Sequence, residues 1–424
     1  MPYELLVTEP ALIKTIKTSL ENDNLFVKPI TKENQFTVIR TNIRDSTEIE
    51  SRFPNIISRQ YEYKLTNLSM VRDIIGFSRN YFQSYITDES ILQTLLDHIP
   101  TRYSIYPPLL LFNNSSMKCF TNGIFINIIS QYKIDLSKYY HSLLYDFIPA
   151  TGMTVVAINK PILEADTMRQ PHNLQILYKD KNVGDEEIWC KLKQNDIWQV
   201  WNPMYTMFSR GNIKEKKRVL DTFKDVRDND VVDLYCGIGY FSFSYLRLGC
   251  RNIFGFELNP WSIMGFWKGY DLNHGFGHSN RSNCHIYNEN NERSLQRITE
   301  YRDTLPNHDL LRIRHINLGL LPSSEQGWPI AIRILSDHND WLQCPLVTLH
   351  IHENVSIEDI NSDKFINQTL TKLGKIPTEL NKNDNNNDDD YHSYKFEVIH
   401  LEKIKTFAPD VWHICLDVNV TITI

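Results

Sequence analysis

The sequence predicts an α/β protein whose second half forms a doubly wound, mostly parallel sheet. From Val231 onward, short apolar runs alternate with stretches of helical spacing, as in chains that build a parallel sheet. The first run, Val231–Cys236, ends at Gly237 and Gly239, where a buried strand can turn directly into a helix. The last two runs are joined by a short turn and predict an antiparallel hairpin.

Length, charge and cysteine usage limit the class of protein. The 424 residues suffice for two or three domains, and a net charge of −6 restricts any nucleic-acid surface to a local patch. The seven cysteines contain no Cys-x-x-Cys pair, which argues against a disulfide framework and a zinc ribbon and indicates a reducing, cytoplasmic location. We expect no signal peptide and no membrane span, because neither pattern is present.

The first hundred residues mix helical and strand signals without catalytic spacing. Ala11–Leu20 and Glu89–His98 predict short helices, and Asn34–Thr41 predicts a strand. Residues 1–100 are therefore expected to form an accessory α+β region.

Residues 101–206 are expected to form a middle α+β domain. Two prolines within Ser104–Phe112 indicate a rigid turn that enters a buried strand, and Met153–Asn159 predicts another strand. Ile188–Tyr205 is rich in aromatic residues at a spacing near two, which predicts strands. Most of these rings are expected in the core, although an exposed ring can stack on a base.

A basic segment precedes the sheet. Ser209-Arg-Gly-Asn212 predicts a loop and cap, and Ile213–Phe223 predicts a helix. Such a charged face is usually solvated surface, but its excess of positive charge beside the glycine turn makes it the best candidate for phosphate contact. The residues assigned to this contact are Arg210, Lys214, Lys217 and Arg218.

Residues 207–424 are expected to form the main domain. Strands are predicted at 231–236, 252–257, 283–288, 312–321 and 345–351, and helices at 240–248, 260–273, 291–302, 325–337 and 356–373. Tyr394–Thr406 and Val411–Thr423 predict the closing hairpin. The Asn/Asp-rich segment 381–390 is expected to be a disordered loop. Seven strands with a terminal hairpin are typical of the class I S-adenosylmethionine-dependent methyltransferase-like fold.

The first two strands predict a half-site for a nucleoside. Gly237 and Gly239 let the backbone approach a ligand, which the next helix faces with its N-terminus. Glu257 ends the second strand, where an acid can accept both ribose hydroxyls. A dinucleotide fingerprint needs a third glycine where this chain has Ser242. Together with Asp233 inside the first strand, this difference favours S-adenosylmethionine.

The ends of the third and fourth strands carry polar residues of different kinds. Glu289, Asn290 and Asn291 follow the third strand and can contact an adenine edge, or serve as an ordinary helix cap. The fourth strand continues into residues 317–324, which offer neither the carboxylate nor the cysteine used by common base methyltransferases. This absence tells against ordinary base methylation.

Five segments together resemble the family of tRNA wybutosine-synthesizing protein 2 in its fungal form. They are Met207–Lys216, Asp233–Phe241, Phe256–Pro260, Asn317–Trp328 and His350–Asn354. Residues 105–109 and 157–161 extend the resemblance, which covers roughly residues 100–424. The family is related to the tRNA guanine-N1 methyltransferases.

The resemblance implies transfer of the α-amino-α-carboxypropyl group of S-adenosylmethionine to C7 of 4-demethylwyosine in phenylalanine tRNA, with release of methylthioadenosine. A sulfonium activates all three attached carbons, so the pose of the methionyl tail decides which one reacts. The base is itself the nucleophile, which agrees with the missing cysteine and carboxylate. The resemblance assigns no catalytic residue. The implied cofactor-binding residues are Ser209, Lys216, Asp233, Tyr235, Gly237, Gly239, Glu257, Glu289, Asn290 and Asn291.

Two other functions stay open at this point, and no metal site is expected. The chain could be a tRNA guanine-N1 methyltransferase, or a non-catalytic tRNA-binding protein with a relic cofactor fold. Without the resemblance, Ser209 and Lys216 would be taken for a helix cap and a surface lysine. His350 and His352 point to the same side of a strand, but two histidines without a third ligand are weak evidence, and we expect no metal.

Overall fold

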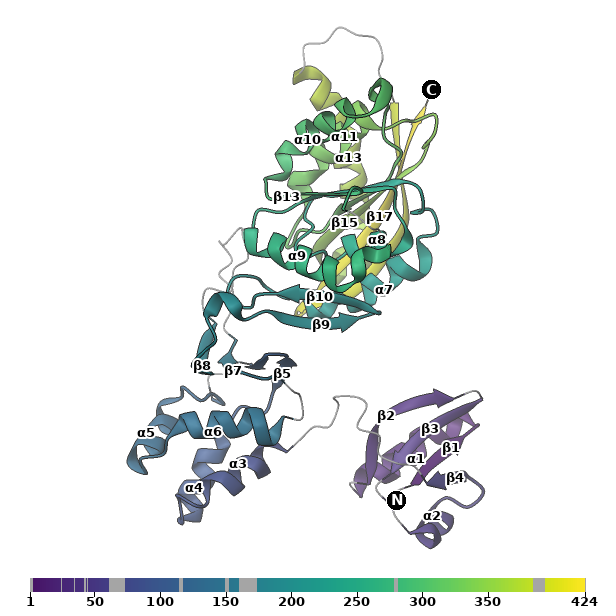
Figure 1. Cartoon of the computed structure of the whole chain (residues 1–424). Helices are drawn as coiled ribbons and strands as arrows, with labels where there is room; N and C mark the ends of the chain where they lie inside the picture. Colours follow the sequence, from purple (N-terminus) through teal and green to yellow (C-terminus); the bar gives the residue numbers. More distant parts are fainter. Residues whose placement is uncertain are drawn as a thin grey trace. The chain divides into compact units, whose positions relative to one another are not determined.

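The computed structural model describes residues 3–60 except 24, 34, 42 and 44, and residues 73–113, 117–148, 152–159, 174–277, 281–383 and 393–423. The chain divides into two compact units, Met1–Asn80 and Tyr81–Ile424 (Figure 1). The sequence-based division near residues 100 and 206 stays a proposal. Across the described ranges, no helix combines the length and apolar character that crossing a membrane requires.

The first unit contains a four-stranded antiparallel sheet of strand order β2-β3-β1-β4. Its elements are β1 (Tyr3–Val7), α1 (Pro10–Asn22), β2 (Phe26–Glu33), β3 (Phe36–Thr41), α2 (Ser46–Arg52) and β4 (Ile57–Gln60). α1 contains the predicted helix and begins at Pro10, because the first helical position needs no N–H donor. β3 matches the predicted strand from Phe36 onward; residue 35 lies in a turn, and residue 34 lies outside the described residues.

The second unit begins with helices and a small mixed sheet of order β5-β6-β7-β8. Helix α3 (Ile74–Phe82) crosses the boundary between the units. The other elements are α4 (Glu89–Asp97), β5 (Tyr103–Tyr106), β6 (Leu109–Phe112), α5 (Gly123–Gln131), α6 (Leu136–Ser142), the π-helical turn η1 (Leu143–Phe147), β7 (Val155–Ile158) and β8 (Gln175–Lys179). α4 confirms the predicted helix, and Asp88 caps it by accepting from the backbone N–H of Ser90.

A separate two-stranded hairpin follows, formed by β9 (Cys190–Gln194) and β10 (Ile197–Trp201). Its turn consists of Asn195 and Asp196, both with positive φ, the conformation that suits a two-residue hairpin turn. Trp201 is buried, whereas the other three rings of this aromatic segment, Trp189, Trp198 and Tyr205, are half-buried, so the expectation of mostly core rings is not met.

The main sheet has seven strands in the order β13-β12-β11-β14-β15-β17-β16, which confirms the predicted fold class. The first five strands of this order are parallel, and β17 runs antiparallel to both of its neighbours. The strands are β11 (Asp230–Asp233), β12 (Asn252–Phe256), β13 (Cys284–Tyr287), β14 (Ile313–Leu318), β15 (Val347–Ser356), β16 (Ser393–Ala408) and β17 (Val411–Thr423). The strand order reverses between β11 and β14, where sheets of this kind bind ligands.

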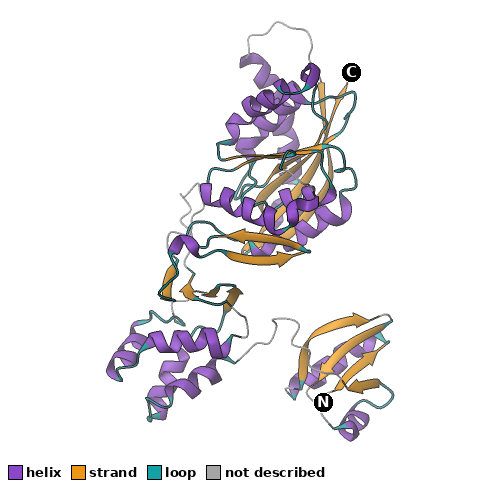
Figure 2. Cartoon of the chain, in the orientation of Figure 1, coloured by secondary structure: helices purple, strands orange, loops and turns teal. Residues whose placement is uncertain are grey.

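Helices cover both faces of this sheet (Figure 2). One face carries α7 (Ile213–Thr222), α8 (Ser242–Leu248) and α9 (Pro260–Leu272). The other carries α10 (Ser294–Asp303), α11 (Trp328–His338), α12 (Ile357–Asn361) and α13 (Lys364–Asn383). Val231 and Val232 belong to different core clusters, because successive strand residues point to opposite faces.

Two helix predictions need correction. The helix predicted to begin at Tyr240 begins at Ser242, because the residues before it complete the turn. The helix predicted at 356–373 is two helices, and the second continues to Asn383. Residues 381–383 of the predicted loop are therefore helical, and 384–390 lie outside the described residues.

Candidate cofactor site

The candidate site lies at the carboxyl ends of β11, β12 and β13, around the turn that follows β11. Gly237 and Gly239 have φ values of 54° and 84°, a region that glycine enters without strain. A Cβ atom at Gly239 would lie 2.7 Å from the ring of Phe243. The turn therefore depends on glycine at this position for both conformation and space.

Asp233 stabilises the glycine turn through hydrogen bonds to two neighbouring elements. Its buried carboxylate accepts hydrogen bonds from Ser242 Oγ at 2.6 Å and from Asn317 Nδ2 at 2.9 Å. Burial raises the pKa of Asp233. Asp233 thus joins β11, α8 and β14, and these contacts support the turn. The pairing with Asn317 joins residues 84 positions apart on neighbouring strands, a contact that spacing in the sequence does not indicate.

Glu257 faces the glycine turn from the end of β12. One carboxylate oxygen accepts from the backbone N–H of Gly237 at 3.1 Å, and the other accepts from that of Asn259 at 2.7 Å. Burial raises the pKa of Glu257 to about 7. Each oxygen keeps a further lone pair, so the carboxylate can still accept hydrogen bonds from two hydroxyls.

The residues after β13 point in different directions. Glu289 forms an ion pair with Arg297 of α10, and Asn290 accepts from the backbone N–H of Glu292 at 3.1 Å as a cap. Asn291 instead donates to the carbonyl of Leu234, at 3.3 Å, in the glycine turn. Of the three predicted adenine contacts, Asn291 is thus the one that lies against this turn through a side-chain hydrogen bond.

Two further residues belong to the walls of the site. Asn288, which the sequence prediction omitted, donates to the carbonyls of Glu257 and Leu258, both at 2.9 Å. Its position as the first residue after β13 is the signal that could have identified it. Tyr235, one of the predicted cofactor-binding residues, is half-buried in the turn, and its hydroxyl lies close to Gly327.

The segment before α7 is hydrogen-bonded to the glycine turn. Tyr240 Oη donates to the carbonyl of Met207 at 2.6 Å and accepts from the backbone N–H of Ser209 at 3.1 Å. Lys405 Nζ, from β16, donates to Ser209 Oγ at 3.3 Å. Tyr240 was not predicted as a site residue, yet it fixes Ser209 beside the glycine turn.

Lys216 is buried in the same region, with 4% of the residue exposed. Its ammonium donates to the side-chain oxygens of Gln194 and Gln199 at 2.8 and 2.5 Å. It lies 5.6 Å from the ring centre of Phe208 and 5.2 Å from that of Tyr240. Burial lowers the pKa of Lys216 to about 7. The residue pattern alone would place Lys216 on the surface, and the structure corrects that interpretation.

The four basic residues proposed for phosphate contact differ in exposure. Arg210, Lys214 and Lys217 are exposed; Lys214 and Lys217 form surface ion pairs with Glu402 and Asp221. These four residues therefore do not form one uniform basic surface.

Arg218 is the exception among them. Its side chain is 13% exposed, and its guanidinium binds Glu215 and Asp417, both at 2.6 Å. This geometry joins α7 to β17 and leaves Arg218 poorly placed for phosphate.

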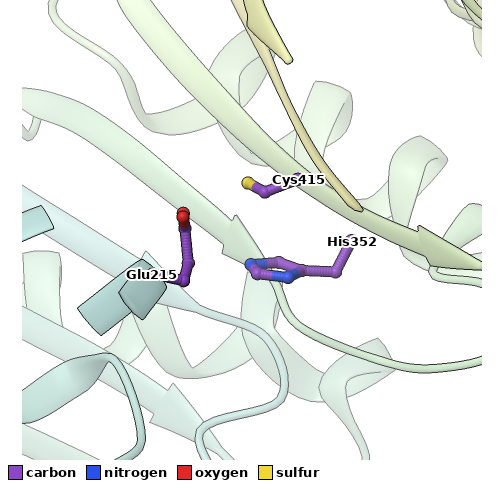
Figure 3. Close-up of side chains that lie close together, drawn as sticks. All are labelled: Glu215, His352 and Cys415. Carbon is purple, nitrogen blue, oxygen red and sulfur yellow. The ribbon is translucent and has the colours of Figure 1, made fainter. Parts of the chain in front are cut away.

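Several histidines and a cysteine lie close together near α7. His350 lies 3.0 Å from His315 and 2.7 Å from Asp417, measured between hydrogen-bonding atoms. Figure 3 shows Glu215, His352 and Cys415, whose ligand-type atoms lie within 4.8 Å of one another.

Among the described residues, a side chain already places a positive charge beside this group. Arg218 binds Glu215 and lies 3.7 Å from Cys415 Sγ. A metal at this position would have to compete with the guanidinium for the same carboxylate. We therefore propose that this group serves the ion-pair network and holds no metal.

Comparisons with known proteins agree with this geometry. The family described as TRM5/TYW2 methyltransferase domain matches residues 194–283, which include β10, the glycine turn and Glu257. A crystal structure of Pyrococcus horikoshii TYW2 in complex with MeSAdo superposes with a TM-score of 0.52 at 19% identity, covering 82% of this chain and 99% of that one. That likeness shows the fold.

Curated relatives show the family. The chain is 32% identical to tRNA wybutosine-synthesizing protein 2 of Schizosaccharomyces pombe, over 76% of this chain and 73% of the relative. It is 41% identical to the protein of that name from Saccharomyces cerevisiae, over 100% of this chain and 99% of the relative. With this identity along the full length of both chains, the protein belongs to the family of tRNA wybutosine-synthesizing protein 2.

Proposed function

We propose that the protein transfers the α-amino-α-carboxypropyl group of S-adenosylmethionine to C7 of 4-demethylwyosine in phenylalanine tRNA. The observation that carries this proposal is the full-length identity of 41% with a protein named for wybutosine synthesis. The nucleoside by-product tests it, because aminocarboxypropyl transfer leaves methylthioadenosine whereas methyl transfer leaves S-adenosylhomocysteine.

The residues around the glycine turn fit a nucleoside with a charged tail. Glu257 offers a carboxylate to two hydroxyls at the edge of this turn. Asn288 and Asn291 supply amides near the end of β13. We propose that Ser209 and Lys216 hold the methionyl end, because the buried ammonium suits a carboxylate.

When bound, S-adenosylmethionine supplies a sulfonium whose three attached carbons are open to attack. The protein then acts by orientation, since only the carbon held against C7 of the base can react. Asp233 is buried and bonded to Ser242 and Asn317, and Glu257 is assigned to the ribose, so we assign nucleophilic work to neither carboxylate. A mechanism without a covalent protein intermediate fits these constraints.

The partner and location follow from the same proposal. The expected partner is the anticodon loop of phenylalanine tRNA, contacted through Arg210, Lys214 and Lys217. We propose a cytoplasmic location, which is supported by seven cysteines that are all unpaired and buried.

Cofactor affinity is expected to pass through a maximum near neutral pH. Glu257 must be ionised to accept two hydroxyls, and its raised pKa of about 7 makes affinity increase as the pH rises through that value. Lys216 must be protonated to hold a carboxylate, and its lowered pKa of about 7 makes affinity decrease above it. Calorimetric titration between about pH 5.5 and 8.5 measures both limbs.

Single variants assign the two limbs of this profile. Glu257→Gln is expected to abolish the acidic limb, and Lys216→Met the alkaline limb. A dissociation constant that does not change with pH would remove both residues from the site.

Neutralising the exposed basic residues is expected to weaken tRNA binding. The triple variant Arg210→Gln, Lys214→Gln, Lys217→Gln removes three positive charges from the start of α7 and the turn before it. Binding releases fewer counterions when a phosphate contact is lost. The plot of log affinity against log salt concentration should therefore become shallower by roughly one unit per contact. Filter binding at several salt concentrations measures this slope.

Lys372→Gln is the matched control. Lys372 is an exposed, ion-paired lysine on α13, which covers the other face of the sheet. An unchanged slope in the triple variant would place the tRNA path elsewhere.

A further inference from the structure

We propose that Gln194 and Gln199 of the β9–β10 hairpin are positioning residues that set Lys216 and thereby determine which carbon of S-adenosylmethionine is transferred. This inference rests on the proposed function, in which Lys216 holds the methionyl carboxylate. Both glutamines are buried, with 6% and 2% of each residue exposed.

The hairpin presents these two side chains together. Gln194 pairs with Ile197 across the hairpin, and Gln199 follows Ile197 by two residues. Because side chains alternate between the faces of a strand pair, Gln194 and Gln199 lie on the same face. The hairpin is fixed in turn by Asn273, whose side chain exchanges hydrogen bonds with both the N–H and the carbonyl of Trp198, at 2.9 and 2.8 Å.

Each glutamine links Lys216 to one wall of the cofactor site. Gln199 accepts from Lys216 through its oxygen and donates through its nitrogen to the carbonyl of Gly239, at 3.4 Å. Gln194 accepts from Lys216 in the same way and donates to the carbonyl of Arg210, also at 3.4 Å. Only a side chain with a donor and an acceptor at one end can make both contacts.

The arrangement leaves the ammonium without a counter-charge. In the described part of the chain, the hydrogen-bond partners of Lys216 are two neutral amide oxygens. They use two of its three N–H groups, and the rings of Phe208 and Tyr240 lie beside it. A buried cation of this kind is costly unless an anion joins it. A carboxylate on the ligand supplies that anion.

Fixing the carboxylate fixes the orientation of the sulfonium. In the proposed reaction, C7 of the base forms a bond to the carbon of the aminocarboxypropyl chain that is attached to sulfur. The bond between that carbon and sulfur breaks. The bonding electrons stay on sulfur as methylthioadenosine, and the C7 proton passes to water. If the tail is released, the methyl carbon can face C7 instead, and S-adenosylhomocysteine is left.

The test compares two ligands that differ in the tail. Methylthioadenosine lacks the carboxylate, so the ratio of its dissociation constant to that of S-adenosylmethionine measures the tail contact. In the double variant Gln194→Met, Gln199→Met we expect calorimetry to show methylthioadenosine affinity within about twofold of the parent, and S-adenosylmethionine affinity reduced by about tenfold or more. We also expect S-adenosylhomocysteine among the products.

Two further variants complete the design. Gln199→Glu places a carboxylate beside Lys216, where it competes with the carboxylate of the ligand, so this variant should lower the ligand ratio. Gln296→Met changes an exposed glutamine on α10 and should change nothing.

Three outcomes would overturn the inference or its premise. Equal loss of both ligands would show that the glutamines only support the fold. An unchanged ratio and by-product would show that they do not position Lys216. S-adenosylhomocysteine from the parent protein would instead contradict the proposed function, while the ligand ratio would still report on the tail contact.

Discussion

Replacing Glu257 with alanine is expected to raise the dissociation constant of S-adenosylmethionine by about 100-fold. The carboxylate stands at the end of β12, and in the proposed complex it accepts hydrogen bonds from two ribose hydroxyls. Each hydrogen bond to a charged group contributes about 1.5–3 kcal/mol, so the loss of two corresponds to a change of at least this size. Calorimetry with the purified protein measures it.

The substitution also removes two acceptors from the turn. The backbone N–H groups of Gly237 and Asn259 lose the partners that they have at 3.1 and 2.7 Å. Gly237 is held at positive φ, so a loss of order in the turn should weaken binding further. Glu257→Gln retains one acceptor oxygen and should show a smaller effect than alanine.

Glu289→Ala is the matched control for this experiment. Glu289 also lies just beyond the carboxyl end of a strand of this sheet, β13, but its carboxylate is paired with Arg297 of α10. We expect its cofactor affinity to stay within about threefold of the parent, because this partly exposed ion pair lies outside the proposed ribose contact. Equal effects at both positions would contradict the assignment of the ribose to Glu257.

Replacing Arg218 with methionine is expected to destabilise the second unit by about 3–5 kcal/mol, the cost of breaking a buried ion pair from one side. The side chains of Glu215 and Asp417 are 2% and 3% exposed and would lose their shared guanidinium. Burial raises the pKa of Asp417, but His350 and Arg218 outweigh it and hold the pKa below its ordinary value. Its contribution to stability is therefore present at neutral pH and is lost as the pH falls.

Thermal unfolding of the full chain measures the effect of Arg218→Met. Lys214→Met removes an exposed ion pair with Glu402 and should cost less than about 1 kcal/mol. Adding Glu215→Gln and Asp417→Asn to Arg218→Met removes the uncompensated charges and should restore part of the stability. If Arg218→Met left the melting temperature unchanged but weakened tRNA binding, the phosphate role predicted from the sequence would hold and the structural role would fail.

The local parts of the site were predictable from the sequence. A short apolar strand, two glycines and an acid at the end of the next strand lie within 27 residues, from Val231 to Glu257. Their spacing in the chain fixes their spacing in a strand–turn–helix–strand unit, because consecutive elements of a parallel sheet are neighbours. The structure accordingly places Gly237 and Glu257 in direct hydrogen-bond contact.

The remaining parts depend on contacts between distant segments. Lys216 is buried because Gln194 and Gln199 come from a separate hairpin, and Arg218 is buried because β17 supplies Asp417 from 199 positions further along the chain. Helical spacing alone cannot distinguish these buried cations from the exposed Lys214 and Lys217 on the same helix. Asn290 and Asn288 show a further ambiguity, since one amide caps a helix and its near neighbour faces the site.

The central claim is that the aminocarboxypropyl group is transferred, and the nucleoside by-product tests it most directly. The purified protein is incubated with S-adenosylmethionine and phenylalanine tRNA that carries 4-demethylwyosine, and the small-molecule nucleosides are separated by chromatography. We predict methylthioadenosine in an amount equal to that of the modified base. S-adenosylhomocysteine in its place, or consumption of neither substrate, would contradict this account.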